Sequence, residues 1–180
     1  MSITHELAIA LLAATMFATQ AHATEFYYTH RYDNAHLAQH PEQLVTSLLL
    51  YINDKVPSND PAYPAPWFTW KLVATRRGEK HLLVQTANLI SKTGSIYHAS
   101  VDCDGAGFDF NLIPGGLHMS IKYSLRMAIV PDPCGEGREA ITQSTTIGGG
   151  DDREFLLQQV PVQVCTTVTG RIDWDSIPAE

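Results

Sequence analysis

The chain contains 180 residues and has a formal net charge of −7 when histidine is counted as neutral. This acidic balance disfavours binding to nucleic acid or to an anionic membrane through a basic surface. The length is enough for one domain with a sizeable hydrophobic core and too short for two.

The first 23 residues have the pattern of an export signal. Leu7–Phe17 is an almost entirely apolar run, and residues 21–23 (Ala-His-Ala) fit the small-x-small rule for signal peptidase. The segment before the run contains no Lys or Arg, unlike most signals. The run is also shorter than the roughly 20 apolar residues that a membrane span requires. We therefore expect residues 1–23 to be removed, leaving a periplasmic or secreted protein with no membrane span.

Two elements are predicted before the first proline-rich segment. Asp33 or Asn34 provides a helix cap and Pro41 ends the helix, which predicts one short N-terminal helix. Leu44–Ile52 is a continuous apolar run. Its length and its position after a proline favour a strand that is buried on both faces, although periodicity alone also allows a helix.

A proline-rich segment follows this strand. Four prolines between residues 57 and 66 remove so many amide donors that a loop or flap is expected. Aromatic side chains exposed on such a loop suit recognition of a partner or a sugar ring, which makes Tyr63 and Trp67 candidate binding residues. The alternative is that Trp67 fills one end of a barrel.

Residues 97–123 are predicted to form three antiparallel strands joined by two-residue turns at Asp104-Gly105 and Gly115-Gly116, because these pairs readily adopt the positive φ angles of such turns. The resulting pairs are Val101–Phe108, Ala99–Phe110 and Tyr97–Leu112 around the first turn, and Leu112–Met119, Phe110–Ile121 and Phe108–Tyr123 around the second. All of these residues fall on one face, which is therefore the predicted core face. Asp102–Phe110 also begins like a calcium loop, but its later positions lack oxygen ligands, so the hairpin is favoured.

Alternation or continuous apolar runs predict further strands at residues 67–75, 81–90, 117–129, 139–147 and 153–165. About eight antiparallel strands at short spacing favour a mostly β fold, either a barrel or a two-layer sandwich, with one short N-terminal helix. Residues 24–165 are expected to form a single β domain, followed by a polar C-terminal tail at 166–180.

The three cysteines, Cys103, Cys134 and Cys165, all follow the signal. In an oxidising compartment two of them are expected to pair. We favour a disulfide between Cys134 and Cys165, because both lie where the chain is free to approach, although spacing does not determine the connectivity.

Three segments resemble landmarks of an uncharacterised family of small exported proteobacterial proteins. They are "YDNAHLAQHPEQLVTSLLL", "DCDGAGFDF" and "GGGDDREFLLQQVPVQVC", in matching order. Members of that family carry an additional cysteine pair upstream of the middle segment, which this chain lacks. The resemblance implies export and a compact β domain, and it implies no catalytic residue or ligand.

Histidine residues give one candidate metal site. His30, His36 and His40 lie close together in sequence, and the last two would share one face of a helix. Imidazoles on one face can bind zinc or copper. The alternative is that they are surface or capping residues, because Pro41 keeps the helix short and no further ligand is defined.

The outward face of the three-stranded region gives a second candidate site. It is predicted to carry His98, Asn111 and Ser120 in one row and Ser100, Asp109 and Lys122 in the next. Ser, His and Asp within reach of one another suggest a nucleophile, but no oxyanion donor or Gly-x-Ser-x-Gly turn accompanies them. Asp109 and Lys122 are better interpreted as a cross-strand charge pair.

Taken together, the sequence favours an exported envelope protein that acts as a non-catalytic binding or inhibitory module without a cofactor. Its expected partner is a protein or small molecule of the envelope. The alternatives are a hydrolase with an unrecognised polar site and a structural envelope component.

Overall fold

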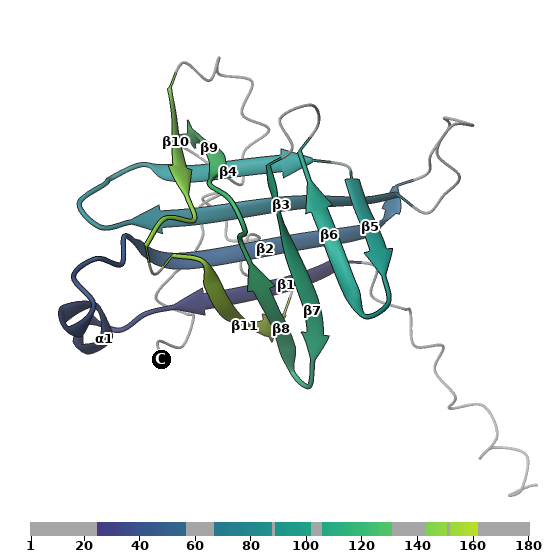
Figure 1. Ribbon diagram of the computed structural model, residues 1–180, viewed down its shortest axis with the longest axis horizontal. Coiled ribbons are helices and arrows are strands. Elements are labelled where there is room, and N and C mark those ends of the chain that lie inside the picture. Colours follow the sequence, from purple (N-terminus) through teal and green to yellow (C-terminus); the bar gives the residue numbers. More distant parts are fainter. Residues whose placement is uncertain are drawn as a thin grey trace, which may run out of the picture.

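The computed structural model describes residues 25–56, 67–87, 89–101, 106–130, 143–150 and 152–161. Within these ranges the chain forms one helix and eleven strands (Figure 1). In chain order they are β1 (Glu25–Arg31), α1 (Asn34–Gln39), β2 (Val45–Val56), β3 (Trp67–Arg76), β4 (Leu82–Ala87), β5 (Leu89–Thr93), β6 (Ile96–Ser100), β7 (Gly107–Ile113), β8 (Gly116–Ser120), β9 (Leu125–Val130), β10 (Ser144–Ile147) and β11 (Glu154–Val160).

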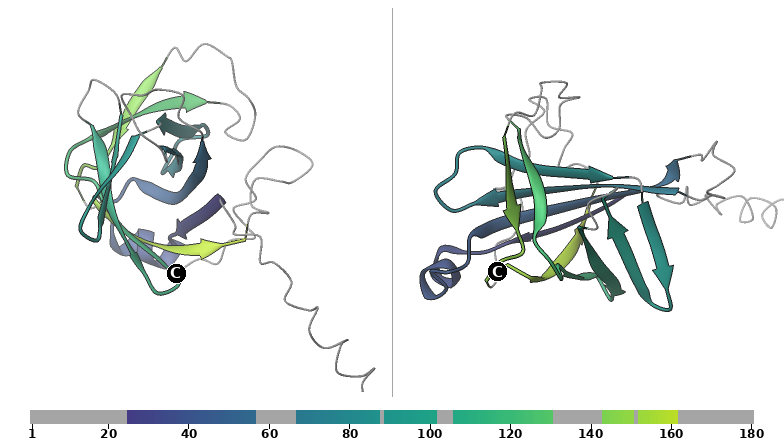
Figure 2. Two further views of the ribbon diagram at one scale, coloured as in Figure 1. Left: turned by 90° about the vertical axis from the view of Figure 1, so that its right-hand side faces the viewer. Right: turned by 45° about the horizontal axis from the view of Figure 1, so that its top comes forward.

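The described strands form one antiparallel sheet in the order β10-β9-β4-β3-β2-β1-β11-β8-β7-β6-β5. Figures 1 and 2 show β5–β8 crossing one face of β1–β4, so the sheet curls into an open half-barrel. The prediction of a mostly β, antiparallel fold is confirmed. A single curled sheet takes the place of a closed barrel or a two-layer sandwich.

The described chain contains more strands than the eight or so expected, because two predicted strands each divide in two. Residues 81–90 contribute to β4, which pairs with β3 and β9, and to β5, which pairs with β6. Residues 117–129 contribute to β8, which pairs with β7 and β11, and to β9, which pairs with β4 and β10. In addition, β1 forms between β2 and β11. A single apolar run can therefore contribute two strands that lie at different positions in the sheet.

The connection between β6 and β7 is longer than predicted. Ala99 pairs with Phe108, and the backbone N–H of Val101 donates to the carbonyl oxygen of Ala106 at 2.9 Å. Four residues therefore separate the paired segments where two were expected. The predicted turn residues themselves, 104–105, lie outside the described ranges.

The turn between β7 and β8 is also displaced. Ile113 pairs with Gly116, so the turn residues are Pro114-Gly115, and Gly115 has a φ of 80°. Proline followed by glycine with positive φ is the pattern of a type II turn. Gly116 leaves no room for a side chain, because a Cβ there would collide with the carbonyl oxygen of Leu157 on β11.

Both displacements are by two residues, so the predicted core face is preserved. Phe108, Phe110 and Ile121 are buried, which confirms their placement on that face. Leu112 and Tyr123 are exceptions, being 53% and 72% exposed. Leu112 lies next to the turn, and Tyr123 lies beyond the end of β8, where inward neighbours are fewer.

The hydrophobic core lies inside the curl, and β2 crosses its centre. Leu48 and Leu50 of β2 belong to this core. Leu49, on the opposite face of the strand, is also buried, beside Val73 of β3. The prediction of a strand buried on both faces is confirmed.

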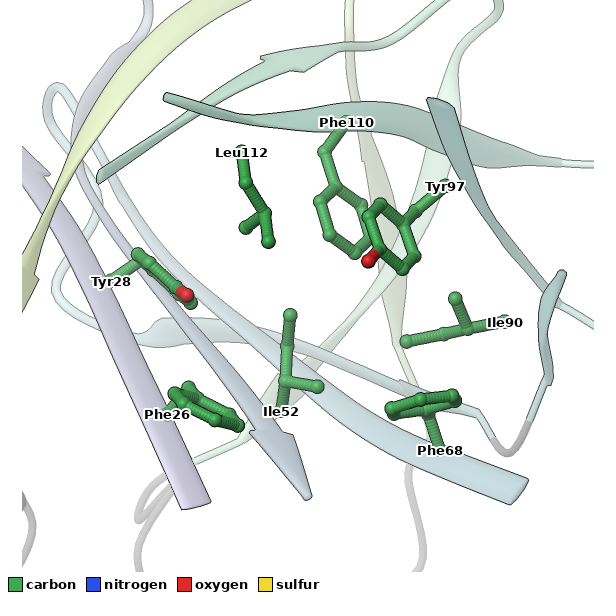
Figure 3. A pocket seen from close by; sticks show the side chains of 8 residues that line it. All are labelled: Phe26, Tyr28, Ile52, Phe68, Ile90, Tyr97, Phe110 and Leu112. Atoms are coloured by element: carbon green, nitrogen blue, oxygen red, sulfur yellow. The ribbon is translucent and has the colours of Figure 1, made fainter. Parts of the chain in front are cut away.

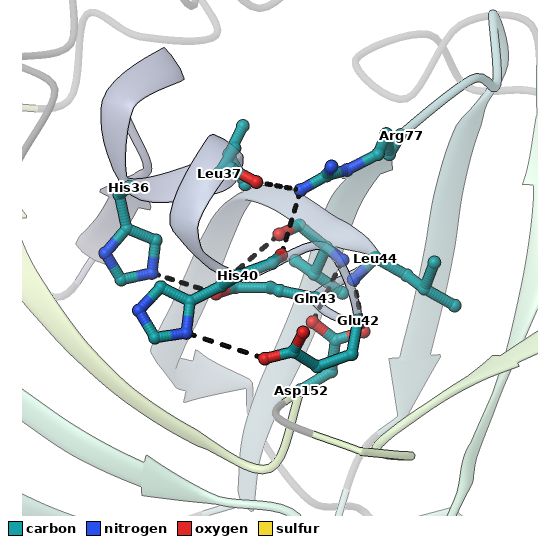
Figure 4. A network of polar contacts seen from close by, with 9 residues as sticks. His36, Leu37, His40, Glu42, Gln43, Leu44, Arg77 and Asp152 are labelled. Carbon is teal, nitrogen blue, oxygen red and sulfur yellow. Dashed lines mark hydrogen bonds and ion pairs between the residues drawn. The ribbon is translucent and has the colours of Figure 1, made fainter.

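Polar contacts attach α1 to the sheet (Figure 4). The carboxylate of Asp33 accepts a hydrogen bond of 2.6 Å from the backbone N–H of His36 and so caps the helix. At the other end, the guanidinium of Arg77 donates to the carbonyl oxygens of Leu37 and His40, at 2.7 and 3.1 Å. The carbonyl oxygen of His40 also accepts from the backbone N–H of Gln43 at 3.1 Å, so Arg77 adds a second link between the end of α1 and the rest of the chain.

Asp152 joins the loop after β10 to the start of β2 (Figure 4). Its side chain is buried, and its two carboxylate oxygens accept hydrogen bonds from the backbone N–H groups of Leu44 at 3.1 Å and Val45 at 2.9 Å. The amide of Gln43 donates to the carbonyl oxygen of Val45 beside them, at 3.2 Å. One buried acid thus joins two segments that lie far apart in the sequence.

Candidate functional site

An apolar pocket of about 240 Å³ lies between two parts of the curled sheet (Figure 3). Strands β1, β2 and β3 contribute one wall, and β5, β6 and β7 contribute the other. The lining residues are Phe26, Tyr28, Ile52, Phe68, Ile90, Tyr97, Phe110 and Leu112. The two walls meet because the curl places β5 against β3, although these strands do not pair in the sheet.

Side-chain alternation explains why these residues share one space. Phe26 and Tyr28 are two residues apart on β1, as are Phe110 and Leu112 on β7, so each pair faces the same side of its strand. The same inward faces fill the hydrophobic core farther along the strands. The pocket is thus continuous with the core, and it is the part that side chains do not fill.

Aromatic rings give the pocket a stiff wall with polar groups at defined places. Tyr97 stacks on Phe110, with ring centroids 4.9 Å apart and an interplanar angle of 9°. Figure 3 shows the hydroxyl oxygens of Tyr28 and Tyr97 directed into the pocket. Burial, and then the nearby Tyr97, raise the pKa of Tyr28, so its hydroxyl is protonated at neutral pH. A protonated hydroxyl can both donate and accept.

The size of the pocket suits one small molecule. A dry apolar cavity of about 150 Å³ binds benzene, and ligand sites start at about 300 Å³. At about 240 Å³, this pocket lies between those values. It can hold a compact apolar group with one or two polar atoms near the tyrosine hydroxyls.

Sequence reasoning did not identify this pocket. Of the two predicted binding residues, Tyr63 lies outside the described ranges. Trp67 is the first residue of β3, immediately before the pocket residue Phe68, and its side chain lies outside what is described. The available signal was the shared face of Tyr97, Phe110 and Leu112, which is indistinguishable from an ordinary core pattern in sequence.

The three candidate metal-binding histidines and Tyr32 form a row of ring contacts, in which His30 meets Tyr32 edge-on, Tyr32 stacks on His36, and His36 stacks on His40. Ring centroids are 4.1 Å apart for His30 and Tyr32, 4.6 Å for Tyr32 and His36, and 4.4 Å for His36 and His40. The Nδ1 of His30 donates to the carbonyl oxygen of Leu156 at 2.7 Å. Among the described residues, no group of three or more His, Cys, Asp or Glu side chains is arranged to hold a metal ion.

Ion pairs cover the outward face of β6–β8. His98 and Asp109 lie opposite each other, and Nδ1 of His98 is 2.7 Å from the Asp109 carboxylate. This nitrogen is the donor, because an ionised carboxylate only accepts. Asp109 also contacts the ammonium of Lys122 at 2.6 Å, which confirms the predicted charge pair.

The outward face places His98, Asp109 and Ser120 in one cross-strand row, but Asp109 lies between the other two, so the serine is not set against the histidine as a nucleophile requires. Ser120 donates its hydroxyl hydrogen to Glu154 at 2.7 Å, and Nε2 of His118 lies 2.8 Å from the same carboxylate. The predicted row of His98, Asn111 and Ser120 is displaced as well. Asn111 pairs with His118, as the two-residue change in register requires.

Asp109→Asn is expected to lower the Tm by about 1–4 °C at neutral pH, as for loss of one cross-strand charge pair. Burial raises the pKa of Asp109, but hydrogen bonds from Lys122 and His98 outweigh it and hold the pKa below its ordinary value. The stabilisation is therefore complete above the ordinary carboxyl pKa of about 4. It is lost as the pH falls through the lowered pKa of the folded state.

Thermal unfolding followed by circular dichroism, at pH 7 and near pH 2, measures this difference, with Ser91→Ala on β5, two strands away, as the control. The Tm difference between wild type and Asp109→Asn should shrink at the acidic pH. A difference that is equally large at both pH values would show that the charge of Asp109 is not responsible.

The predicted disulfide and the export signal cannot be placed on this fold. Cys103, Cys134 and Cys165, like residues 1–23, lie outside the described ranges. Of the described part of the chain, no helix is long and apolar enough to cross a membrane. No protein-family model, curated protein or solved structure matches the chain.

Proposed function

We propose that this protein is exported and that it binds a small, largely apolar molecule in the pocket between β1–β3 and β5–β7. The observation that supports this most directly is the composition of the lining. All eight side chains are Phe, Tyr, Ile or Leu, and they come from six strands. Apolar pockets with a few oriented polar groups are the usual form of small-molecule sites.

The same lining favours binding over catalysis. The eight residues include no imidazole, carboxylate, thiol or ammonium group that could serve as an acid, base or nucleophile at neutral pH. Two His–carboxylate pairs that could do so, His98 with Asp109 and His118 with Glu154, lie on the outward face. A binding role in the envelope therefore fits the pocket better than hydrolysis does.

Leu112→Glu tests this proposal. Leu112 lines the pocket but is exposed enough for a substitution to leave the fold intact. A carboxylate at this wall opposes the entry of an apolar molecule, because the charge would lose water on binding. We expect wild-type protein to bind the neutral fluorescent probe N-phenyl-1-naphthylamine saturably, and Leu112→Glu to weaken that binding about tenfold or more.

Leu156→Glu is the matched control. Leu156 is 56% exposed, close to the exposure of Leu112, and lies between the buried residues Phe155 and Leu157 on β11, so it faces outward. The Leu156→Glu variant should bind the probe as the wild-type protein does. Circular dichroism spectra establish that both variants are folded. The proposal is wrong if the wild-type protein gives no saturable fluorescence increase, or if the two variants weaken binding equally.

A further inference from the structure

Lys92 lies at the edge of the pocket, on the face of the sheet that lines it. It lies two residues after the pocket residue Ile90 on β5 and therefore faces the same side of the strand. In the sheet it pairs with Tyr97 of β6, another pocket residue. Its ammonium nitrogen is 3.1 Å from the Tyr97 hydroxyl oxygen and 4.7 Å from the centroid of the ring.

The ammonium of Lys92 retains capacity for a further partner. It carries three N–H donors, and among the described residues its partner is Tyr97, with no carboxylate paired to it. The chain as a whole is acidic. A cation without a paired carboxylate among the described residues, next to an apolar space, thus marks an end of the pocket that attracts negative charge.

Tyr97 extends this attraction into the pocket. Because its oxygen accepts the hydrogen bond from Lys92, its own O–H hydrogen remains available to donate. Figure 3 shows this hydroxyl directed inward, and that of Tyr28 likewise. An acceptor placed there would receive a hydrogen bond from Tyr97 and a charge-assisted one from Lys92, and charge-assisted bonds are about twice as strong as neutral ones.

We propose that the ligand is a free carboxylic acid with a compact alkyl or aryl body. Its carboxylate would contact Lys92 and Tyr97, and its body would fill the space lined by Phe26, Ile52 and Phe68. A single ammonium with one hydroxyl suits a singly charged, two-oxygen head. A cationic head would be repelled by Lys92, and a neutral head would lose the charge-assisted bond. This proposal rests on the proposed function, because it assigns the ligand class of the same pocket.

Competition experiments test the proposal. Decanoate, decanol or decylammonium is added at pH 8 to the full chain with bound N-phenyl-1-naphthylamine, the two ionic compounds below their micellar concentrations and decanol below its solubility limit. Each of these three molecules has a chain of ten carbons, and they differ in the head. We expect decanoate to displace the probe at a concentration about tenfold lower than decanol, consistent with one hydrogen bond to a charged group. Decylammonium should be the weakest competitor.

Two lysine variants identify the group responsible. Lys92→Gln should make decanoate no better than decanol and leave displacement by decanol within twofold of wild type. Lys80→Gln, which removes an exposed lysine in the β3–β4 connection, should retain the wild-type preference. Tyr97→Phe should reduce the preference in part, because it keeps the ring and removes the hydroxyl.

The outcomes separate this proposal from the proposed function. If decanol and decanoate displace the probe equally from wild type, or if Lys92→Gln keeps the preference for decanoate, the carboxylate assignment is wrong and the apolar pocket stands. If neither the probe nor any of the three competitors binds wild type by fluorescence or calorimetry, the proposed function itself is wrong.

Discussion

Replacing Trp70 with alanine is expected to lower the free energy of unfolding by about 3–5 kcal/mol. Trp70 is 1% exposed and is among the largest fully buried side chains of the described core. Its ring packs edge-on against Phe108, with centroids 4.9 Å apart and an interplanar angle of 78°. Its removal leaves a cavity between β3 and β7 that neighbouring side chains fill only in part. Urea unfolding followed by far-ultraviolet circular dichroism measures the loss.

Trp70→Phe separates the loss of volume from the loss of the polar group. The buried indole N–H has no hydrogen-bond partner among the described residues, so removing it costs no hydrogen bond. We expect this variant to lose much less stability than Trp70→Ala, about 1 kcal/mol. A loss below about 1 kcal/mol for the alanine variant would be typical of a surface position. Such a result would show that the sheet does not close around Trp70.

Asp152→Ala is expected to lower the free energy of unfolding by about 2–4 kcal/mol, because each buried donor left without a partner costs about 1–3 kcal/mol. The side chain is 2% exposed, and its carboxylate accepts from two backbone N–H groups, those of Leu44 and Val45. Val45 is itself fully buried, so water does not replace the lost acceptor there. Urea unfolding again measures the loss.

Asp152→Asn serves as the conservative variant for this prediction, and Glu42→Ala serves as the surface control. Asparagine keeps one oxygen acceptor and should lose less stability than alanine. Glu42 is an exposed acid in the same region, 3.6 Å from the imidazole of His40, and exposed ion pairs contribute less than about 1 kcal/mol. If Asp152→Ala is no more destabilising than Glu42→Ala, the buried carboxylate does not anchor β2.

Local sequence pattern was sufficient to predict on which face of a strand these side chains lie. Alternation in residues 97–123 predicts that Phe108, Phe110 and Ile121 share an inward face, and all three are buried. The continuous run at 44–52 predicts a strand buried on both faces, as found for β2. The first feature depends on a period of two and the second on a continuous apolar run, and each segment carries its pattern by itself.

Alternation did not determine the register between strands. A displacement of two residues keeps every side chain on its face, so alternation allows the predicted and the observed pairings equally. Turn preference did not separate them either, because Pro114-Gly115 and Gly115-Gly116 each supply residues suited to a tight turn. In the structure Gly116 belongs to β8, where it pairs with β11 and meets the carbonyl of Leu157 too closely for a side chain, so the turn is at Pro114-Gly115.

The candidate site depends on tertiary structure to a greater degree still. Alternation alone places Tyr97 and Phe110 on an inward face. Only the curl of the sheet brings them opposite Phe26 and Phe68 and leaves an open space between them. Asp152 follows a run of three glycines in the sequence and acquires its role only where the start of β2 meets it. Sequence determines which side chains avoid water, because that preference is local. Which of them meet is decided by strand pairing and curl, because those depend on segments far apart in the chain.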